Sequence, residues 1–228
     1  MNNSLGEELV KALDNKIAFN IPIGSGVPIP QSVVTTWIIM AVVVILSIIF
    51  TRKLSIIPSK PQMCVEMLID FIYSFFEDIL GKEGRKYIPY LGTVIIYLAF
   101  ANGIGLIGVT PPTKDLNMPV ALALMSICLI EFAGIYEKGF KGFFKSLAHP
   151  LPIIAPLNVL EIFIRPLSLC MRLFGNILGG VIVMELIKIV LPIAIPIPFS
   201  FYFDIFDGLI QAYIFAFLTS LFLKETIE

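Results

Sequence analysis

The chain has 228 residues, of which 57% are hydrophobic and only 14% are charged, and its formal net charge is -1. Soluble domains carry about 25% charged residues, so this composition excludes an ordinary globular enzyme and is typical of a polytopic membrane protein. Three cysteines lie singly in apolar segments, so we expect neither a disulfide framework nor a metal or cofactor site; they are Cys64, Cys128 and Cys170. We predict an all-α polytopic membrane protein that forms one membrane domain over residues 1–228.

The first 30 residues are predicted to form an outer amino-terminal segment. Ser4 to Lys16 repeats apolar residues at three-to-four spacing, which predicts an amphipathic helix on the membrane surface. This stretch is acidic and polar, so we expect no cleavable signal peptide. A Gly/Pro-rich link, IPIGSGVPIP, leads to Val33 to Phe50, which is uncharged and long enough for a first crossing. Arg52, Lys53 and Lys60 follow, so the positive-inside rule places the amino terminus outside.

Residues 31–86 are completed by a second, more polar helix. Pro61 to Leu80 carries four acids at spacings that place most of them on one stripe; they are Glu66, Asp70, Glu77 and Asp78. A full crossing would bury these acids. We therefore expect a helix that lies along, or dips into, the cytoplasmic side.

Residues 87–138 are predicted to form a helical hairpin. Tyr87 to Val109 crosses outward with a single polar interruption at Asn102, and Pro111 to Asn117 forms the outer turn. Met118 to Tyr136 returns inward, and lysines at the end of this crossing mark the cytoplasmic side; they are Lys138, Lys141 and Lys145. Glu131 lies toward the inner end of this crossing.

Residues 157–223 are predicted to form a long, tilted final hairpin. Prolines in KGFFKSLAHPLPIIAP predict a surface link, where His149 is interpreted as an interfacial side chain rather than a proton relay. A helix of over 30 residues then runs to about Leu191, longer than a bilayer is thick, so it must tilt or bend, and Pro166 offers a bend point. Phe199 to Leu223 follows a proline-rich turn. The chain thus has about five crossings, and its carboxyl terminus is cytoplasmic.

The long helix of this hairpin carries charge inside the membrane. An arginine at the centre of a membrane helix costs roughly 2.5–3.5 kcal/mol, so it marks a functional site by default. Six residues share one face at about 100° per residue: Glu161, Arg165, Ser168, Arg172, Asn176 and Gly179. Glu161 and Arg165 are four apart and can pair. Arg172 has no carboxylate of its own helix within reach, so its counter-charge must come from elsewhere.

The last helix carries a second polar stripe, formed by Asp204, Asp207 and Gln211. An antiparallel hairpin brings the two stripes together, with Gln211 at the level of Arg172. Asp204, Asp207 and Glu185 then lie further toward the outer side, where acids are tolerable if water reaches them. This predicts an aqueous pocket that opens outward and stops near Arg172. Two alternatives stay open: Glu185 can pair with Lys188, and the two aspartates can complement a helix dipole.

Small residues line up with the arginine face: Gly175, Gly179 and Gly180. Glycines at this spacing let another helix approach closely. That helix either belongs to this chain or comes from another subunit carrying a carboxylate.

The segment RPLSLCMRLFGNILGG resembles the signature of subunit a of the F-type ATP synthase, the stator that faces the rotating c-ring. QAYIFAFLTSLFL and TKDLN resemble the last helix and outer turn of this family. The resemblance implies a non-catalytic subunit that carries protons or sodium ions through two offset half-channels. Arg172 takes the place of the essential arginine, Gln211 that of its glutamine neighbour and Asn176 that of the motif asparagine.

The resemblance also implies partners and a location. We expect c-ring subunits, the peripheral stalk subunit b, the rest of the ATP synthase complex and the lipid bilayer as partners, and no nucleic acid. The expected location is a bacterial-type plasma membrane. One departure is that Val181 stands where many bacterial members have a glutamate. Glu185, one turn further on, is expected to take that role, together with Asp204, which stands where many relatives have a histidine.

Two other functions compete with this interpretation. A secondary transporter or channel also holds charges at membrane depth, but it would offer a complete site within one chain, and no repeat relates the two halves. An intramembrane enzyme is disfavoured because no H-E-x-x-H or G-x-S-x-G motif occurs.

Overall fold

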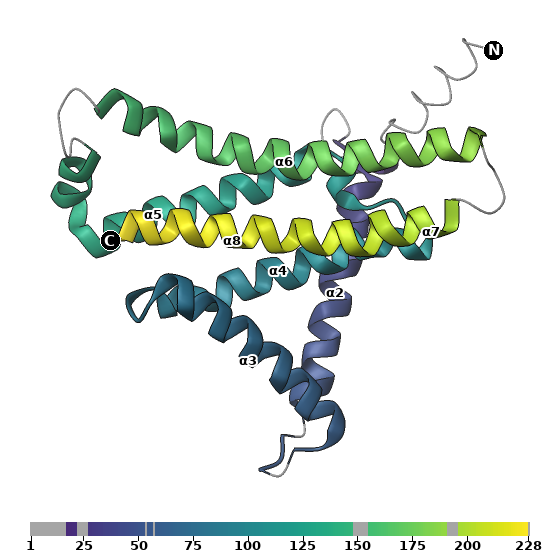
Figure 1. Cartoon of the computed structure of the whole chain (residues 1–228), viewed down its shortest axis with the longest axis horizontal. Helices are drawn as coiled ribbons and strands as arrows, with labels where there is room; N and C mark the ends of the chain where they lie inside the picture. The colour runs from purple at the N-terminus through teal and green to yellow at the C-terminus, as the bar shows by residue number, and fades with distance from the viewer. Residues whose placement is uncertain are drawn as a thin grey trace.

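A computed structural model describes residues 17–21, 27–52, 54–56, 58–147, 155–190 and 196–227. The predicted surface helix from Ser4 to Lys16 and the link histidine His149 lie outside these residues. The predicted all-α architecture is confirmed within the described ranges, where helices predominate (Figure 1). Its α-helices are α2 (Gln31–Thr51), α3 (Lys60–Leu80), α4 (Ile88–Gly103), α5 (Asn117–Leu147), α6 (Ala155–Val190), α7 (Pro196–Phe201) and α8 (Gly208–Ile227).

Short segments of other helix types extend the α-helices. They are the 3₁₀ turns η1 (Glu83–Tyr87), η2 (Ile104–Ile107) and η3 (Pro112–Lys114), and the π-helical segment η5 (Tyr202–Asp207). With these extensions, five stretches of the described chain are long and apolar enough to cross a membrane: Gln31–Thr51, Glu83–Ile107, Asn117–Phe140, Pro156–Met184 and Pro198–Ile227. These are the five crossings that hydropathy and length predicted.

A small β-hairpin precedes the first crossing, where the sequence predicted only an irregular link. β1 (Ile17–Ile21) pairs antiparallel with β2 (Val27–Pro30). The link was misread because Pro28 and Pro30 argue against a strand, yet proline is tolerated where a strand lies at a sheet edge. In a two-stranded sheet both strands are edges.

The helix α3 forms where expected but is not among the five spans. It buries Ile72, Phe76 and Leu80 against the other helices, while Asp70 and Asp78 are exposed. This one-sided burial explains the acid stripe. The helix runs obliquely across the others, and α2 crosses them steeply (Figure 1).

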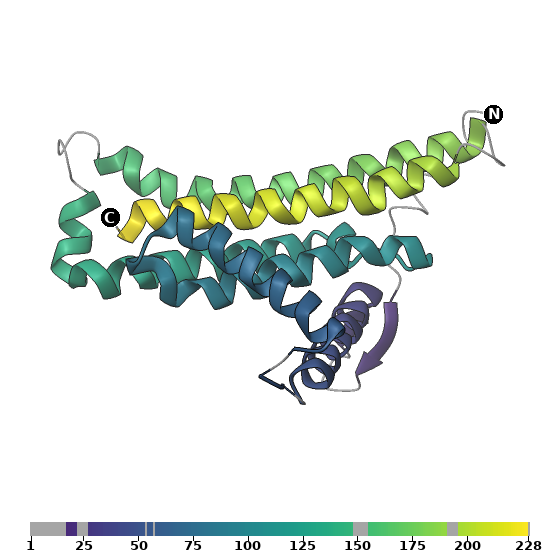
Figure 2. The ribbon, with the colours of Figure 1, turned by 60° about the horizontal axis from the view of Figure 1, so that its bottom comes forward.

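The helices α4, α5, α6 and α8 lie side by side and form the bundle that holds the candidate site (Figures 1 and 2). The helix α8 is central, because its buried residues Ala216 and Leu223 join one core with α3, α4 and α5, whereas Ala212 and Phe215 join a second core with α4, α5 and α6. In that second core, α6 contributes Leu169, Cys170 and Leu173, which are neighbours of Arg172 in the sequence.

Length dictates how α6 sits in a bilayer. Its 36 residues at about 1.5 Å each make a rod of about 54 Å, against a hydrocarbon core of about 30 Å. The helix continues through Pro166, and its ribbon curves gently along its length without a sharp kink (Figure 2). Strong inclination, rather than a break at the proline, therefore accommodates its length.

Candidate functional site

The final hairpin, formed by α6 with α7, η5 and α8, has a register fixed by two contacts. Asn176 donates its side-chain Nδ2–H to Asp207 Oδ2 at 2.7 Å. One turn along, a Cβ placed on Gly180 would lie 3.4 Å from the Phe203 ring. Asn176 and Gly180 are four residues apart, as are Phe203 and Asp207. One turn in the other direction, the same register sets Arg172 opposite Gln211, the level at which the sequence expected them.

Arg172 is exposed, and within the described ranges no hydrogen bond or ion pair involves it. Its neighbours Leu169 and Leu173 are buried in the second core, which fixes the helix while the arginine itself stays exposed. The sequence offers Arg172 no carboxylate on its own helix, and the described residues of the fold supply none either.

Gln211 has the opposite environment. The residue is 5% exposed, and its Nε2 is buried without a hydrogen-bond partner among the described residues. An unsatisfied buried donor costs about 1–3 kcal/mol. Among the described residues, the Gln211 amide donor and the Arg172 guanidinium therefore both lack a partner.

The glycines beside Arg172 divide into two groups. A Cβ added to Gly175 or Gly179 would meet nothing within 4 Å, and both residues are exposed. Gly180 instead contacts Phe203. Packing within this chain, one of the two alternatives for these glycines, thus explains Gly180, whereas the surface formed by Gly175 and Gly179, here called the glycine face, stays open.

The acids of the last helix lie on an irregular helix that the sequence did not reveal. The segment η5, which contains Asp204 and Asp207, is π-helical, a form that is rare and frequent at functional sites. A π-helical turn is wider than an α-helical one, and the shared face of Asp204, Asp207 and Gln211 stays a prediction. Asp207 meets Asn176, whereas side-chain positions of Asp204, Glu185 and Lys188 fall outside what the structure describes. Pairing of Glu185 with Lys188 stays a prediction.

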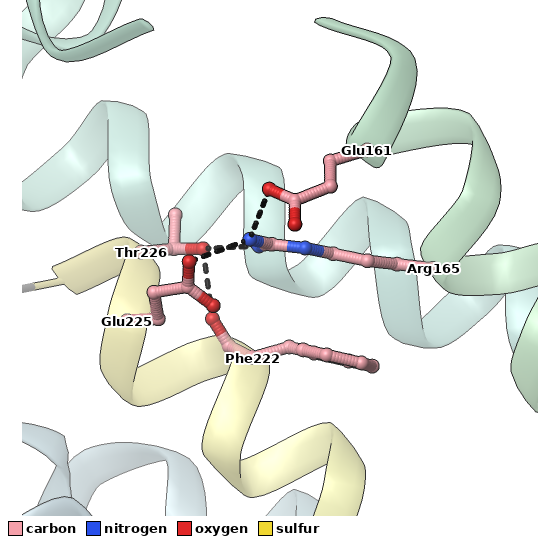
Figure 3. Close-up of polar contacts among 5 residues, drawn as sticks. All are labelled: Glu161, Arg165, Phe222, Glu225 and Thr226. Atoms are coloured by element: carbon pink, nitrogen blue, oxygen red, sulfur yellow. Dashed lines mark hydrogen bonds and ion pairs between the residues drawn. The ribbon is translucent and has the colours of Figure 1, made fainter. Parts of the chain in front are cut away.

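Arg165 forms a cluster at the other end of the hairpin (Figure 3). Its guanidinium lies 3.2 Å from a carboxylate oxygen of Glu161 and 2.9 Å from one of Glu225, and it donates to the Thr226 hydroxyl at 3.5 Å. It also stacks over the Phe222 ring, 5.1 Å from the centroid. The predicted pairing with Glu161 is confirmed. The three partners on α8 were missed because they are about 60 residues away in sequence, and two of them, Glu225 and Thr226, follow the predicted end of the last crossing.

A buried polar network joins α4 to the start of α8. Asn102 donates to the Gly208 carbonyl oxygen at 2.9 Å and accepts a hydrogen bond from the Thr113 hydroxyl at 3.0 Å. Asn102 is 3% exposed and Thr113 is fully buried. The sequence singled out Asn102 as a polar interruption, but its partners depend on tertiary contacts between distant segments.

Known proteins resemble this chain over nearly its whole length. A family model described as ATP synthase A chain matches residues 33–224. An ATP synthase subunit a from Moorella thermoacetica is 38% identical over 89% of this chain and 93% of its own length. An ATP synthase subunit a 2 from a Bradyrhizobium species is 38% identical over 88% and 90%, respectively. A sodium ion specific ATP synthase subunit a from Propionigenium modestum is 30% identical over 89% of this chain and 75% of its own length.

Proposed function

The chain belongs to the ATP synthase A chain family, and from this premise we propose that it is the stator across which ions reach and leave a rotating ring of carboxylate-bearing subunits. Membership makes it a multi-pass protein of the bacterial plasma membrane, within the ATP synthase complex, that serves ion transport and ATP synthesis. In our proposal the ATP chemistry lies on other subunits, and the partners of this chain are the c-ring and the peripheral stalk subunit b.

The observation that carries the proposal is the exposed Arg172 beside the glycine face, with no partner among the described residues. An arginine keeps its charge at all physiological pH values, so inside a membrane it requires an anion. The open space over Gly175 and Gly179 lets a partner helix come close. Arg172 attracts an arriving ring carboxylate in its ionised form, so the carboxylate gives up its ion before it passes. The same positive charge prevents ions from leaking directly from one half-channel to the other.

We place the entry and exit paths at opposite ends of the hairpin. The outer half-channel is assigned to the Asp207 end, with Asn176 as its hydrogen-bonded neighbour and with Glu185 and Asp204 as further acids. Glu161 and Arg165, together with Glu225, are assigned to the inner mouth. We assign Gln211 to the level of Arg172 between the two ends, where its buried Nε2–H has no partner among the described residues. The amino terminus is then outside and the carboxyl terminus cytoplasmic.

The test is Arg172→Ala in the whole complex reconstituted into vesicles. We expect ATP-driven ion pumping to be abolished while ATP hydrolysis by the soluble head continues. Lys82→Ala is the matched control, because Lys82 is an exposed cation outside the proposed ion path. Normal coupled pumping by Arg172→Ala would refute the stator assignment. Repeating the hydrolysis measurement with and without sodium identifies the ion.

A further inference from the structure

Two buried polar side chains outside the proposed ion path, Asn102 and Thr113, are linked in series to one backbone carbonyl. Asn102 comes from the end of α4 and Thr113 from the 3₁₀ turn η3, and their hydrogen bonds form a chain from the Thr113 hydroxyl through the Asn102 amide to the Gly208 carbonyl oxygen. A carbonyl oxygen has two acceptor lone pairs, so Gly208 can accept this bond in addition to one within its helix.

The approach of the two backbones at this point is unusually close. A Cβ on Gly208 would lie 2.8 Å from the Asn102 Cβ, closer than such atoms approach in proteins. Glycine at position 208 is therefore needed for the amide of Asn102 to reach the carbonyl. The contact is specific in both shape and hydrogen bonding.

Gly208 directly follows the π-helical segment η5, which ends at Asp207. On one side, η5 contacts α6 through the Asn176–Asp207 hydrogen bond and the Gly180–Phe203 contact. On the other side, Asn102 holds the Gly208 carbonyl. A π-helical turn has no intrinsic preference over an α-helical one and persists where tertiary contacts favour it.

We propose that Asn102 and Thr113 are positioning residues that hold η5 in register with α6, so that Asp207 meets Asn176. The proposal rests on the proposed function for the assignment of Asp207 to the outer ion path. Thr113 orients the Asn102 amide by donating to its Oδ1, which leaves the Nδ2–H for Gly208. Neither residue touches the ion.

The register can be read directly by a disulfide. A Cβ on Gly180 lies 4.0 Å from the Phe203 Cβ, inside the range of about 3.5–4.5 Å that disulfides require. The test is the rate at which Gly180→Cys and Phe203→Cys cross-link in the whole complex, after Cys64, Cys128 and Cys170 are replaced by alanine.

Thr113→Val keeps the shape of the side chain and removes its hydrogen bond. We expect it to slow cross-linking by about fivefold or more, the population change that one lost buried hydrogen bond produces. Thr113→Ser, which retains the hydroxyl, is expected to restore the rate. Thr219→Val is the matched control, because this equally buried hydroxyl donates to Phe215 within α8. Thr113→Ala serves the same test if the valine variant does not assemble.

Unchanged cross-linking in Thr113→Val or Thr113→Ala would overturn the positioning proposal, whatever happens to transport. ATP-driven pumping is measured separately in the same variants without the cysteine pair. Slowed cross-linking with undiminished pumping would support the positioning role and instead count against Asp207 as part of the ion path. The two proposals therefore fail by different results.

Discussion

Replacing Gly208 by alanine tests the close contact between α4 and α8 by overfilling it. The new Cβ would lie 2.8 Å from the Asn102 Cβ, whereas carbon atoms pack at about 3.5–4.0 Å. The helices must then separate locally by roughly 0.7–1.2 Å. The bond from Asn102 to the Gly208 oxygen, now 2.9 Å, would lengthen by a similar amount and pass the limit of a hydrogen bond.

The cost follows from these two effects. Overpacking costs about 1–3 kcal/mol, and the broken buried hydrogen bond adds about 1–3 kcal/mol. Alanine returns up to about 1 kcal/mol through its higher helix propensity. We therefore expect Gly208→Ala to lower the free energy of unfolding by about 1–6 kcal/mol, measured by denaturant titration of the detergent-solubilised subunit.

Gly103→Ala is the matched control, because a Cβ on this neighbouring helical glycine meets nothing within 4 Å. Adding Asn102→Gly to Gly208→Ala restores the space but not the hydrogen bond, so the double variant should recover only the overpacking part of the loss. Equal unfolding midpoints for Gly208→Ala and Gly103→Ala would refute the close approach on which this reasoning depends.

Three further substitutions separate the ring-facing surface from the two ends of the hairpin. A Cβ at Gly175 meets nothing within 4 Å, so we expect Gly175→Leu to assemble normally but to slow ATP-driven pumping at least about tenfold, the effect of about 1.4 kcal/mol against ring approach. Asp207→Asn retains an oxygen that accepts from Asn176, so the hairpin should keep its thermal stability while ion uptake from the outside falls in a flux assay. Arg165→Gln breaks two ion pairs with half-exposed carboxylates and one ring contact, and we expect a loss of only about 1–2 kcal/mol in the denaturant titration.

Most of the architecture was predictable because a membrane helix can be recognised from its own stretch of sequence. A span needs only length and apolar composition, and the five expected crossings are the five in the described chain. The type of helix was harder to predict from the sequence. In our proposal the π-helical segment Tyr202–Asp207 is held by contacts from Asn102 and Asn176, and neither contact has a signature in the local sequence.

The candidate site was predictable where the presence or absence of an oppositely charged residue could be judged within one helix. Arg172 stood out because its own helix offers no carboxylate, and Arg165 because Glu161 is four residues before it. The contacts of Arg165 with Glu225 and Thr226 required the register of two helices, which periodicity does not supply. Side-chain depth could be estimated from helix rise alone, which is why the level of Gln211 was expected.

Among the described residues of the hairpin, acids near both ends have partners, whereas Arg172 between them has none. Asp207 accepts a hydrogen bond from Asn176 at one end, and Glu161 and Glu225 both pair with Arg165 at the other. These acids lie at least one helical turn from Arg172, and each already has a favourable partner, so a move toward Arg172 would break an existing contact. Because Leu169 and Leu173 are buried, α6 cannot rotate about its axis to bring Arg172 closer to these acids. Local pairing of the neighbouring acids thus keeps the positive field of Arg172 directed at the open glycine face, where in our proposal the ring carboxylate passes.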